Sequence, residues 1–333
     1  MLDHPSYSAA WTKLLNSAER AQEPGLEGRV RVVIGGAGDG KTKLIRRLET
    51  LDWAKPTLDG PEGDIIPIKY VEVPSRVTPK ALVSAIATAF GESPPRSYTA
   101  ENIVDFLVPI FEGVELRLLL LDEAHWLMKG KSEDIQIQNA EFIKSLLNRT
   151  KINIILAGVH EIDKLHDYLH DQFRRRLTPK ILLKPYVWSS KGERKWFIAI
   201  VHHYENRLNL PEKSELGRSQ MAARLYLVSR GSLGIVVQYL SAALEYVADR
   251  DGSNIQPIDL SQAHRDLSTS ITDSIGADPD MFLPPATCVR DDPFLCDWTN
   301  FKRLWAKVFA EHKDETDGQD TSRPTRLARG RVL

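Results

Sequence analysis

The chain has 333 residues, of which 42% are hydrophobic and 27% charged, and its formal net charge is -1. This composition is typical of a soluble protein with two domains, or one large domain with an appendage. A net charge near zero excludes a global basic field, so nucleic-acid contacts would come from local patches. The two cysteines, Cys288 and Cys296, argue against a disulfide scaffold and against a zinc site. They are typical of free thiols in a reducing compartment.

The first residues do not resemble a secretory signal. Asp3 and His4 stand where a signal would be basic and then apolar, and no apolar segment approaches the length of a membrane span. We therefore expect a cytoplasmic protein. Residues 8–21 have the spacing of a short amphipathic helix, which could fold over a nucleotide base or pack on the core.

A glycine-rich stretch follows the first expected strand, the apolar run from Val30 to Ile34, and precedes a helical pattern. It matches G-x-x-x-x-G-K-[ST] in its setting of strand, loop and helix. The glycines let backbone N–H groups face a phosphate, to which the helix N-terminus adds a positive dipole. Lys41 is expected to reach the β- and γ-phosphates of ATP, and the Thr42 hydroxyl to bind Mg²⁺. The predicted nucleotide-binding residues are Gly35, Gly36, Ala37, Gly38, Asp39, Gly40, Lys41 and Thr42.

The next elements lead to a second motif. The polar connection Lys55–Asp64 predicts a loop, and the alternation in Ile65–Val73 predicts a strand despite its proline. Thr78 is a plausible N-cap, with Pro79 at the first position of a helix. Another helix is expected at roughly residues 100–111.

Four consecutive leucines, Leu118–Leu121, predict a strand buried on both faces of a parallel sheet. Asp122 and Glu123 follow directly, at the end of the strand where open α/β sheets place ligands. We expect Asp122 to hold the Mg²⁺ shell through water and Glu123 to polarise the attacking water. In the sequence, one further strand lies between the glycine loop and this acidic strand. Such an interposed strand is typical of the branch of ATPases that includes AAA+ and RecA-like proteins. The letters D-E-A-H also occur in helicases, but no further helicase motif is present.

A helix over residues 134–148 and a buried strand over Ile152–Val159 follow. AAA+ proteins usually place a polar sensing residue at the end of this strand. Here Val159 stands at that place, with Asn153 too early and His160 one step late.

Three histidines nearby, His160, His166 and His170, raise the possibility of a metal. Lys164 stands where H-E-x-x-H needs a histidine, so surface histidines are the preferred interpretation.

The run of Arg174, Arg175 and Arg176 has two interpretations. It could be a basic patch that faces solvent or DNA. It could also supply an arginine finger to the γ-phosphate on a neighbouring subunit, because a guanidinium stabilises developing charge. We favour the finger, with Arg176 first and Arg175 second. Ile181–Leu183 is the expected fifth strand.

Pro185–Trp188 marks a boundary, after which the pattern is helical. Ser190 and Glu193 form a capping box, and further helices are expected at about residues 217–229 and 233–248. Arg230, in this helical segment, could sense the bound nucleotide or act as a plain helix cap.

Beyond residue 270 the pattern weakens, with one last amphipathic helix expected over Trp298–Phe309. Residues 311–320 hold five acids, and residues 321–333 hold four arginines and no acid. This composition predicts a disordered tail. A basic terminus that docks on DNA or a partner is the alternative.

These motifs, in this order, resemble the TniB/TnsC-type AAA+ transposition regulators, including those of CRISPR-associated transposons. The resemblance covers roughly residues 8–265, and Val159 departs from the usual threonine. The matching segments are Gly35–Thr42, Leu118–His125, Ala157–Glu161, Gln172–Arg176, Pro185–Trp188 and Ser229–Gly234.

The resemblance implies an α/β fold, with a five-stranded AAA+ core at residues 1–187, a helical lid at 188–268 and an extension at 269–333. It implies an ATPase with ATP and Mg²⁺ as cofactors that assembles as a ring or helical filament on duplex DNA. Arg176 of one subunit would bind the γ-phosphate on the next. The partners would be a TnsB/TniA-like transposase and a TniQ-like targeting protein, and hydrolysis would promote disassembly.

The family's DNA-backbone contacts come from the start of the second helix and nearby loops. Arg76, Thr78 and Lys80 occupy that place here, and Lys129 and Lys131 form a second candidate loop. Such contacts hold phosphates without reading sequence. Ordinary surface charge is the alternative for these residues.

Two other classes of function stay open at this point. One is a different AAA+ class, such as an ExeA-type secretion ATPase or a replication loader. The other is a nucleotide-gated switch that binds protein only.

Overall fold

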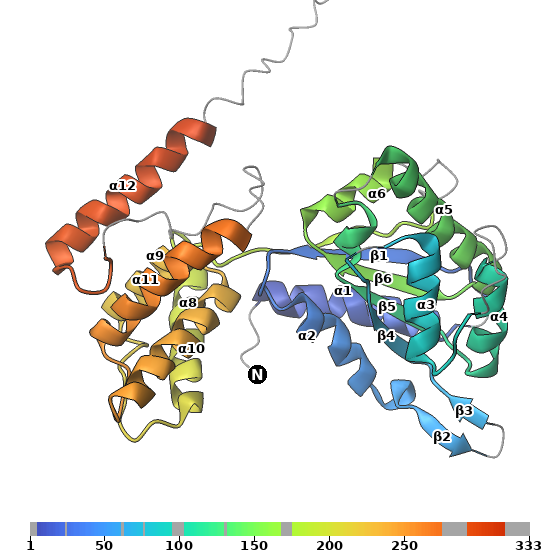
Figure 1. Cartoon of the computed structure of the whole chain (residues 1–333), viewed down its shortest axis with the longest axis horizontal. Coiled ribbons are helices and arrows are strands. Elements are labelled where there is room, and N and C mark those ends of the chain that lie inside the picture. Colours follow the sequence, from blue (N-terminus) through green and yellow to red (C-terminus); the bar gives the residue numbers. More distant parts are fainter. Residues whose placement is uncertain are drawn as a thin grey trace, which may run out of the picture. The chain divides into compact units, whose positions relative to one another are not determined.

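The computed structural model describes residues 5–23, 25–60, 63–75, 77–94, 103–129, 132–167, 175–274 and 292–316 (Figure 1). The chain forms two compact units. The first, here the α/β unit, runs to Pro185 and includes Ser232–Gly234; the second, here the helical unit, comprises Tyr186–Gly231 and the chain from Ile235 onward. The division therefore falls after Pro185, two residues before the expected boundary.

The α/β unit is built on one sheet of five parallel strands, as predicted. Val32 and Leu121 both pair with Leu156, so β6 lies between β1 and β5. The strand that ends in the two acids is thus separated from the glycine loop by one strand, although both reach the same edge of the sheet. The order across the sheet is β4 (Ile68–Glu72), β5 (Leu118–Asp122), β6 (Asn153–Gly158), β1 (Val30–Gly35) and β7 (Ile181–Leu183).

Helices cover both faces of this sheet (Figure 1). Leu14 and Leu44, from the first two helices, share a buried cluster with Leu120. Because side chains alternate along a strand, Leu119 and Leu121 face the opposite side, and they are fully buried there. The helices are α1 (Pro5–Ala21), α2 (Lys41–Arg46), α3 (Pro79–Ala89), α4 (Ile103–Gly113), α5 (Glu133–Thr150) and α6 (Lys164–Asp167), with the 3₁₀ turns η1 (Arg47–Thr50), η2 (Asp52–Ala54), η3 (Ala124–Leu127) and η4 (His160–Asp163).

The connection after α2 differs from its prediction. Two short antiparallel strands, β2 (Thr57–Gly60) and β3 (Gly63–Ile65), occupy a segment expected to be loop. The strand expected to start at Ile65 starts at Ile68. Pro67 has no N–H to donate to the ladder, and its carbonyl instead accepts from Leu118 N at 3.0 Å. Proline therefore separates the hairpin from the central sheet.

The entry to α3 follows the predicted chemistry. Thr78 is the N-cap, its Oγ1 accepts from the backbone N of Ala81 at 3.2 Å, and Pro79 opens the helix. A threonine cap and a first-turn proline satisfy or remove N–H groups that have no partner inside the helix. The turn that follows β4 therefore has a defined end at Thr78.

The helical unit holds five helices among the described residues. Ser190 caps the first of them by accepting from Glu193 N at 3.4 Å, as predicted, while Glu193 Oε2 accepts from Val187 N at 2.8 Å. A buried pair, Tyr239 and His264, joins two of the helices at 2.8 Å. The helices are α8 (Lys191–Leu208), α9 (Ser219–Ser229), α10 (Leu233–Asp249), α11 (Pro257–Ser274) and α12 (Trp298–Thr316).

No single helix in the described ranges is long and apolar enough to cross a membrane. The bent pair formed by α9 and α10 meets the length and composition criteria together, with an angle of 109° between its helices. Eight residues of α9, from Ala222 to Ser229, are buried inside the unit.

Candidate nucleotide-binding site

The glycine-rich loop joins β1 to α2 at the carboxyl edge of the sheet. Gly38 and Gly40 have φ values of +78° and +84°, a conformation that side chains disfavour. The loop is closed by Asp39, whose Oδ2 accepts from Gly36 N at 2.7 Å. This curled backbone has the shape that can cradle a phosphate group.

Lys41 lies folded over this loop. Its Nζ donates to the carbonyls of Gly35 and Gly36 at 3.0 and 2.8 Å, and the residue is 6% exposed. Burial lowers the pKa of Lys41, and the nearby carboxylate of Glu123 opposes that shift. A desolvated ammonium group held by carbonyl dipoles is poised to bind an anion, which fits the β- and γ-phosphates of ATP.

Thr42 and Asp122 meet in the structure although they are far apart in the chain. Thr42 Oγ1 donates to Asp122 Oδ2 at 2.5 Å, and the same oxygen accepts from Tyr70 OH at 3.2 Å. Asp122 is 1% exposed. A hydroxyl and a carboxylate in contact are oxygen ligands of the kind that Mg²⁺ takes, so these residues fit the cation that accompanies ATP. The described residues contain no group of three His, Cys, Asp or Glu that would form a separate metal site.

Glu123 follows Asp122 in a left-handed conformation, with φ +52°. Its backbone N donates to Asp122 Oδ1 at 2.9 Å, and its Oε2 lies 3.3 Å from His125 Nδ1. Burial and then the charge of Asp122 raise the pKa of Glu123, whereas burial lowers the pKa of His125. A glutamate with a raised pKa, beside a phosphate loop, is suited to orient or deprotonate water.

A segment from the distant Ser232–Gly234 packs against the loop within the α/β unit. Ser232 Oγ donates to Asp39 Oδ1 at 3.0 Å. A Cβ atom on Gly234 would lie 2.3 Å from the Cα of Gly38, so only glycine allows this approach. Burial raises the pKa of Asp39, against the effect of its bonds to Ser232 and Gly36.

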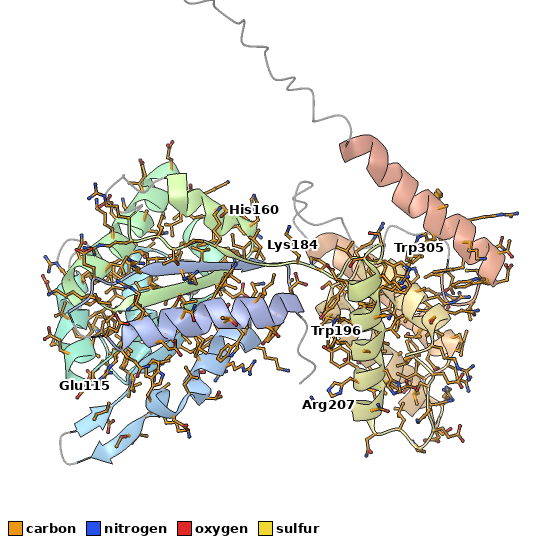
Figure 2. The ribbon with its side chains drawn as sticks, turned by 180° about the vertical axis from the view of Figure 1, so that it is seen from behind. Glu115, His160, Lys184, Trp196, Arg207 and Trp305 are labelled. Carbon is orange, nitrogen blue, oxygen red and sulfur yellow. The ribbon has the colours of Figure 1, made fainter. Side chains whose placement is uncertain are left out.

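The sensing position remains without a clear polar side chain. Val159 is extended and precedes η4. His160 (labelled in Figure 2) begins η4. Its Nδ1 lies 3.4 Å from Asp163 Oδ2. Asn153 lies at the far edge of the sheet, where its Oδ1 accepts from Arg29 N at 3.1 Å. Asn153 is therefore separated from the loop by the length of a strand.

The arginine run lies only partly within the described residues, because 168–174 fall outside them. Arg175 is exposed. The Arg176 carbonyl accepts from Val30 N at 2.9 Å, and its guanidinium lies 3.5 Å from Glu27. Val30 begins β1, so Arg176 is at the edge of the sheet opposite the glycine loop of its own chain.

The expected DNA-contacting residues are placed in two segments. Thr78 and Lys80 are exposed at the start of α3, on the same edge as Asp122. Lys129 lies 3.6 Å from Glu161 and above the Trp126 ring. Arg76 and Lys131 lie outside the described residues.

Arg230 belongs to the helical unit. It is 9% exposed and ends α9 in a left-handed conformation, with its N–H donating to Tyr226 O at 2.8 Å. This geometry is that of a helix terminus, one of the two roles expected for it. The nucleotide-sensing role stays a prediction.

Three participants in the site were not assigned to it from the sequence, although two of them, Ser232 and Gly234, lie in the Ser229–Gly234 segment of the family resemblance. Tyr70 pairs across the sheet with Leu120 and reaches Asp122 from the neighbouring strand. Ser232 and Gly234 reach the loop from a distant part of the chain. Tyr70 lies in a strand that alternates apolar and polar residues, so nothing in the sequence singles it out, and nothing links Ser232 to Asp39.

Solved structures share the fold of this chain. Cdc6p from Pyrobaculum aerophilum matches with a TM-score of 0.58 at 16% identity, over 80% of this chain and 68% of that chain. The ADP form of the Aeropyrum pernix ORC2 protein matches with a TM-score of 0.54 at 15% identity, over 91% of this chain and 85% of that chain. No curated protein matches the sequence. At these identities the likeness establishes the fold alone.

Strand order, glycine loop and acidic strand together define the AAA+ class of P-loop ATPase folds. The family model described as bacterial TniB protein matches residues 2–186. The chain belongs to the TniB family, and membership implies an ATPase associated with transposition.

Proposed function

We propose that this protein is an ATP-dependent regulator of transposition that assembles as a ring or helical filament on duplex DNA. It would link a TniQ-like targeting protein to a TnsB/TniA-like transposase and disassemble when ATP is hydrolysed. The observation that carries the proposal is the contact of Thr42 with Asp122 beside the Lys41 loop, in a chain of the TniB family.

The chemistry proposed for this chain follows from the positions of four side chains. Lys41 would exchange its two carbonyl contacts for phosphate oxygens. Thr42 and Asp122 would hold Mg²⁺, which neutralises phosphate charge when it is bound. Glu123 would orient the attacking water and accept its proton, because its raised pKa makes it a stronger base than an exposed glutamate.

Assembly is proposed from the position of Arg176. Five residues, Val30 to Ile34, separate the end of β1 where Arg176 is bonded from Gly35, the first residue of the glycine loop. At about 3.3 Å per residue this distance is roughly 16 Å, beyond the reach of one side chain. Arg176 therefore cannot serve the nucleotide of its own chain and would act on that of a neighbour. Arg175 is the second candidate. Loss of the γ-phosphate would remove this contact and loosen the interface.

DNA contact is proposed at the carboxyl edge of the sheet. The exposed Thr78 and Lys80 start α3 there, and Lys129 lies on the turn after η3. Arg76 and Lys131 would extend these two segments. Contacts from lysine, arginine and helix N-termini are directed at phosphates, so binding would be sequence-independent and weakened by salt.

The test is negative-stain microscopy of the full chain with a non-hydrolysable ATP analogue and duplex DNA. We expect rings or filaments on DNA that are absent for Lys41→Ala. Particles that form equally without DNA would favour a secretion-type or loader-type AAA+ protein. A monomer under all conditions, with ATP turnover unchanged by DNA, would favour a protein-binding switch and overturn the proposal.

A further inference from the structure

A second concave site lies entirely within the helical unit. It is a groove of about 460 Å³ between the starts of α8, α9 and α12. Its walls are aromatic: Trp188, Trp298, Phe301 and Trp305 all line it. Figure 2 shows Trp305 among the side chains of this unit. Grooves of several hundred cubic ångströms with apolar walls and few polar groups are typical ligand sites.

The aromatic side chains that form the walls of the groove pack against one another. The Trp305 ring stacks on Tyr226, with centroids 5.7 Å apart, and lies 5.5 Å from Trp188. Trp298 stacks on Phe301 at 4.9 Å. All three tryptophans keep part of their surface exposed. A preformed aromatic surface loses little conformational entropy when it binds, which is why tryptophan dominates binding hot spots.

The groove carries positive charge and no negative charge. Arg194 and Lys302 line it, and its remaining lining residues are neutral. The Arg194 guanidinium lies 5.9 Å from the centroid of Trp188, and Lys302 Nζ lies 5.9 Å from that of Trp298. Each cation is thus placed beside a different aromatic wall, so a ligand with several negative charges would find a cationic partner at each of the two walls.

We propose that this groove binds an acidic peptide segment of a partner protein, which inserts an aromatic side chain between the tryptophans and pairs its carboxylates with Arg194 and Lys302. The predominantly apolar lining favours a peptide over a nucleic acid, which would present a phosphate for every base and would need more than two cations. The groove lies in the helical unit, whereas the glycine loop lies in the α/β unit. Peptide binding is therefore a property additional to the proposed ATPase role.

The test uses the full chain and a fluorescein-labelled peptide, Asp-Asp-Phe-Trp-Asp-Leu-Asp-Asp, in an anisotropy titration. Two control peptides replace either the three apolar residues by serine or the five aspartates by lysine. We expect binding of the acidic aromatic peptide and at least tenfold weaker binding of both controls. The Lys41→Ala variant should bind it equally well, so failure of the ATPase proposal would not affect this result.

Three variants locate the site. Trp305→Ala should weaken binding by at least about tenfold, as expected for a central aromatic anchor. The double variant Arg194→Gln with Lys302→Gln alters only half-buried or exposed side chains and should weaken binding about fivefold. Lys307 is an exposed charge on α12 outside the groove, so Lys307→Gln should change the affinity for the peptide less than twofold. Circular dichroism checks that each variant folds.

Some outcomes would overturn the inference. Equal binding of the acidic peptide and its serine control would show that the aromatic walls are not used. Binding that survives both the Trp305 and the double variant would place the peptide elsewhere. Displacement of the peptide by an oligothymidylate, with the same dependence on Trp305, would make the groove a nucleic-acid site.

Discussion

Tyr70 donates its phenolic hydrogen to Asp122 across the boundary between β4 and β5, at 3.2 Å. The accepting oxygen also accepts from Thr42, so two hydroxyl groups orient one carboxylate. The ring of Tyr70 is itself held by Arg46, whose guanidinium carbon lies 4.8 Å from the ring centroid. Burial raises the pKa of Tyr70, and the negative charge of Asp122 raises it further. The phenol therefore stays protonated and remains a hydrogen-bond donor.

Removing the Tyr70 hydroxyl should weaken the binding of Mg²⁺ more than the binding of ATP. We expect Tyr70→Phe to raise the Mg²⁺ concentration for half-maximal ATP hydrolysis by about three- to tenfold, the effect of losing one intramolecular hydrogen bond of typical strength. Metal-free ATP binding should be unchanged. Tyr246→Phe is the matched control, because Tyr246 donates to Asp266 in the helical unit. An unaltered Mg²⁺ requirement in Tyr70→Phe would show that Thr42 alone orients Asp122.

Lys41 provides the charge that should hold the phosphates. We expect Lys41→Ala to weaken ATP binding by at least about a hundredfold, because a desolvated charge pair would be lost. Binding can be followed with a fluorescent ATP analogue. Lys43→Ala is the control, since Lys43 is exposed two residues along the same helix. Retained tight binding by the Lys41 variant would contradict the assignment of the loop.

The raised pKa of Glu123 predicts the pH dependence of hydrolysis. The ionised carboxylate is the form that orients or deprotonates water, so turnover should fall as the pH drops through this pKa. The acid limb of the kcat/KM profile, which reports pKa values of the free enzyme, should therefore lie above the ordinary pKa of a glutamate. Glu123→Gln should bind ATP, hydrolyse it at least about a hundredfold more slowly and lose this limb. A limb that persists in the variant would belong to another group.

The proposal that Arg176 acts as an arginine finger on a neighbouring subunit can be tested by mixing two inactive variants. Arg176→Ala should bind ATP but hydrolyse it poorly, whereas Lys41→Ala should not bind ATP but keeps its arginine. A mixture of the two variants should recover part of the activity, because some interfaces combine an intact loop with an intact Arg176. Glu27→Gln, which removes the partner of Arg176 within its chain, should retain activity. If the mixture is as inactive as its components, Arg176 does not act in trans.

The close approach of Gly38 and Gly234 predicts a cost for any side chain at Gly234. A Cβ at Gly234 would lie 2.3 Å from the Gly38 Cα, so the two backbones would have to separate. We expect Gly234→Ala to lower the free energy of unfolding by about 1–3 kcal/mol, measured by urea denaturation. Gly192→Ala is the control, because no atom lies within 4 Å of its added Cβ. Equal stability of the two variants would mean that the contact is not tight in solution.

Much of the α/β unit followed from local patterns in the chain. The leucine run of β5 and the apolar run of β1 predicted buried strands, and Thr78 with Pro79 predicted the start of α3. These signals are readable because hydrophobic periodicity and capping depend on residues close together in the chain. The hairpin of β2 and β3 was missed because its segment is short and polar.

The sequence by itself determined the class of the protein. The glycine loop and the acidic strand were sufficient to indicate a nucleotide-hydrolysing ATPase, because phosphate binding needs a short contiguous motif. The resemblance to the TniB type came from the later segments, from Ala157–Glu161 to Ser229–Gly234. Tertiary structure alone decided which distant groups complete the site. Tyr70 reaches Asp122 only through strand pairing, and Ser232 reaches Asp39 only because Gly234 allows the backbones to approach. Contacts between residues far apart in the chain depend on packing, which local periodicity does not encode.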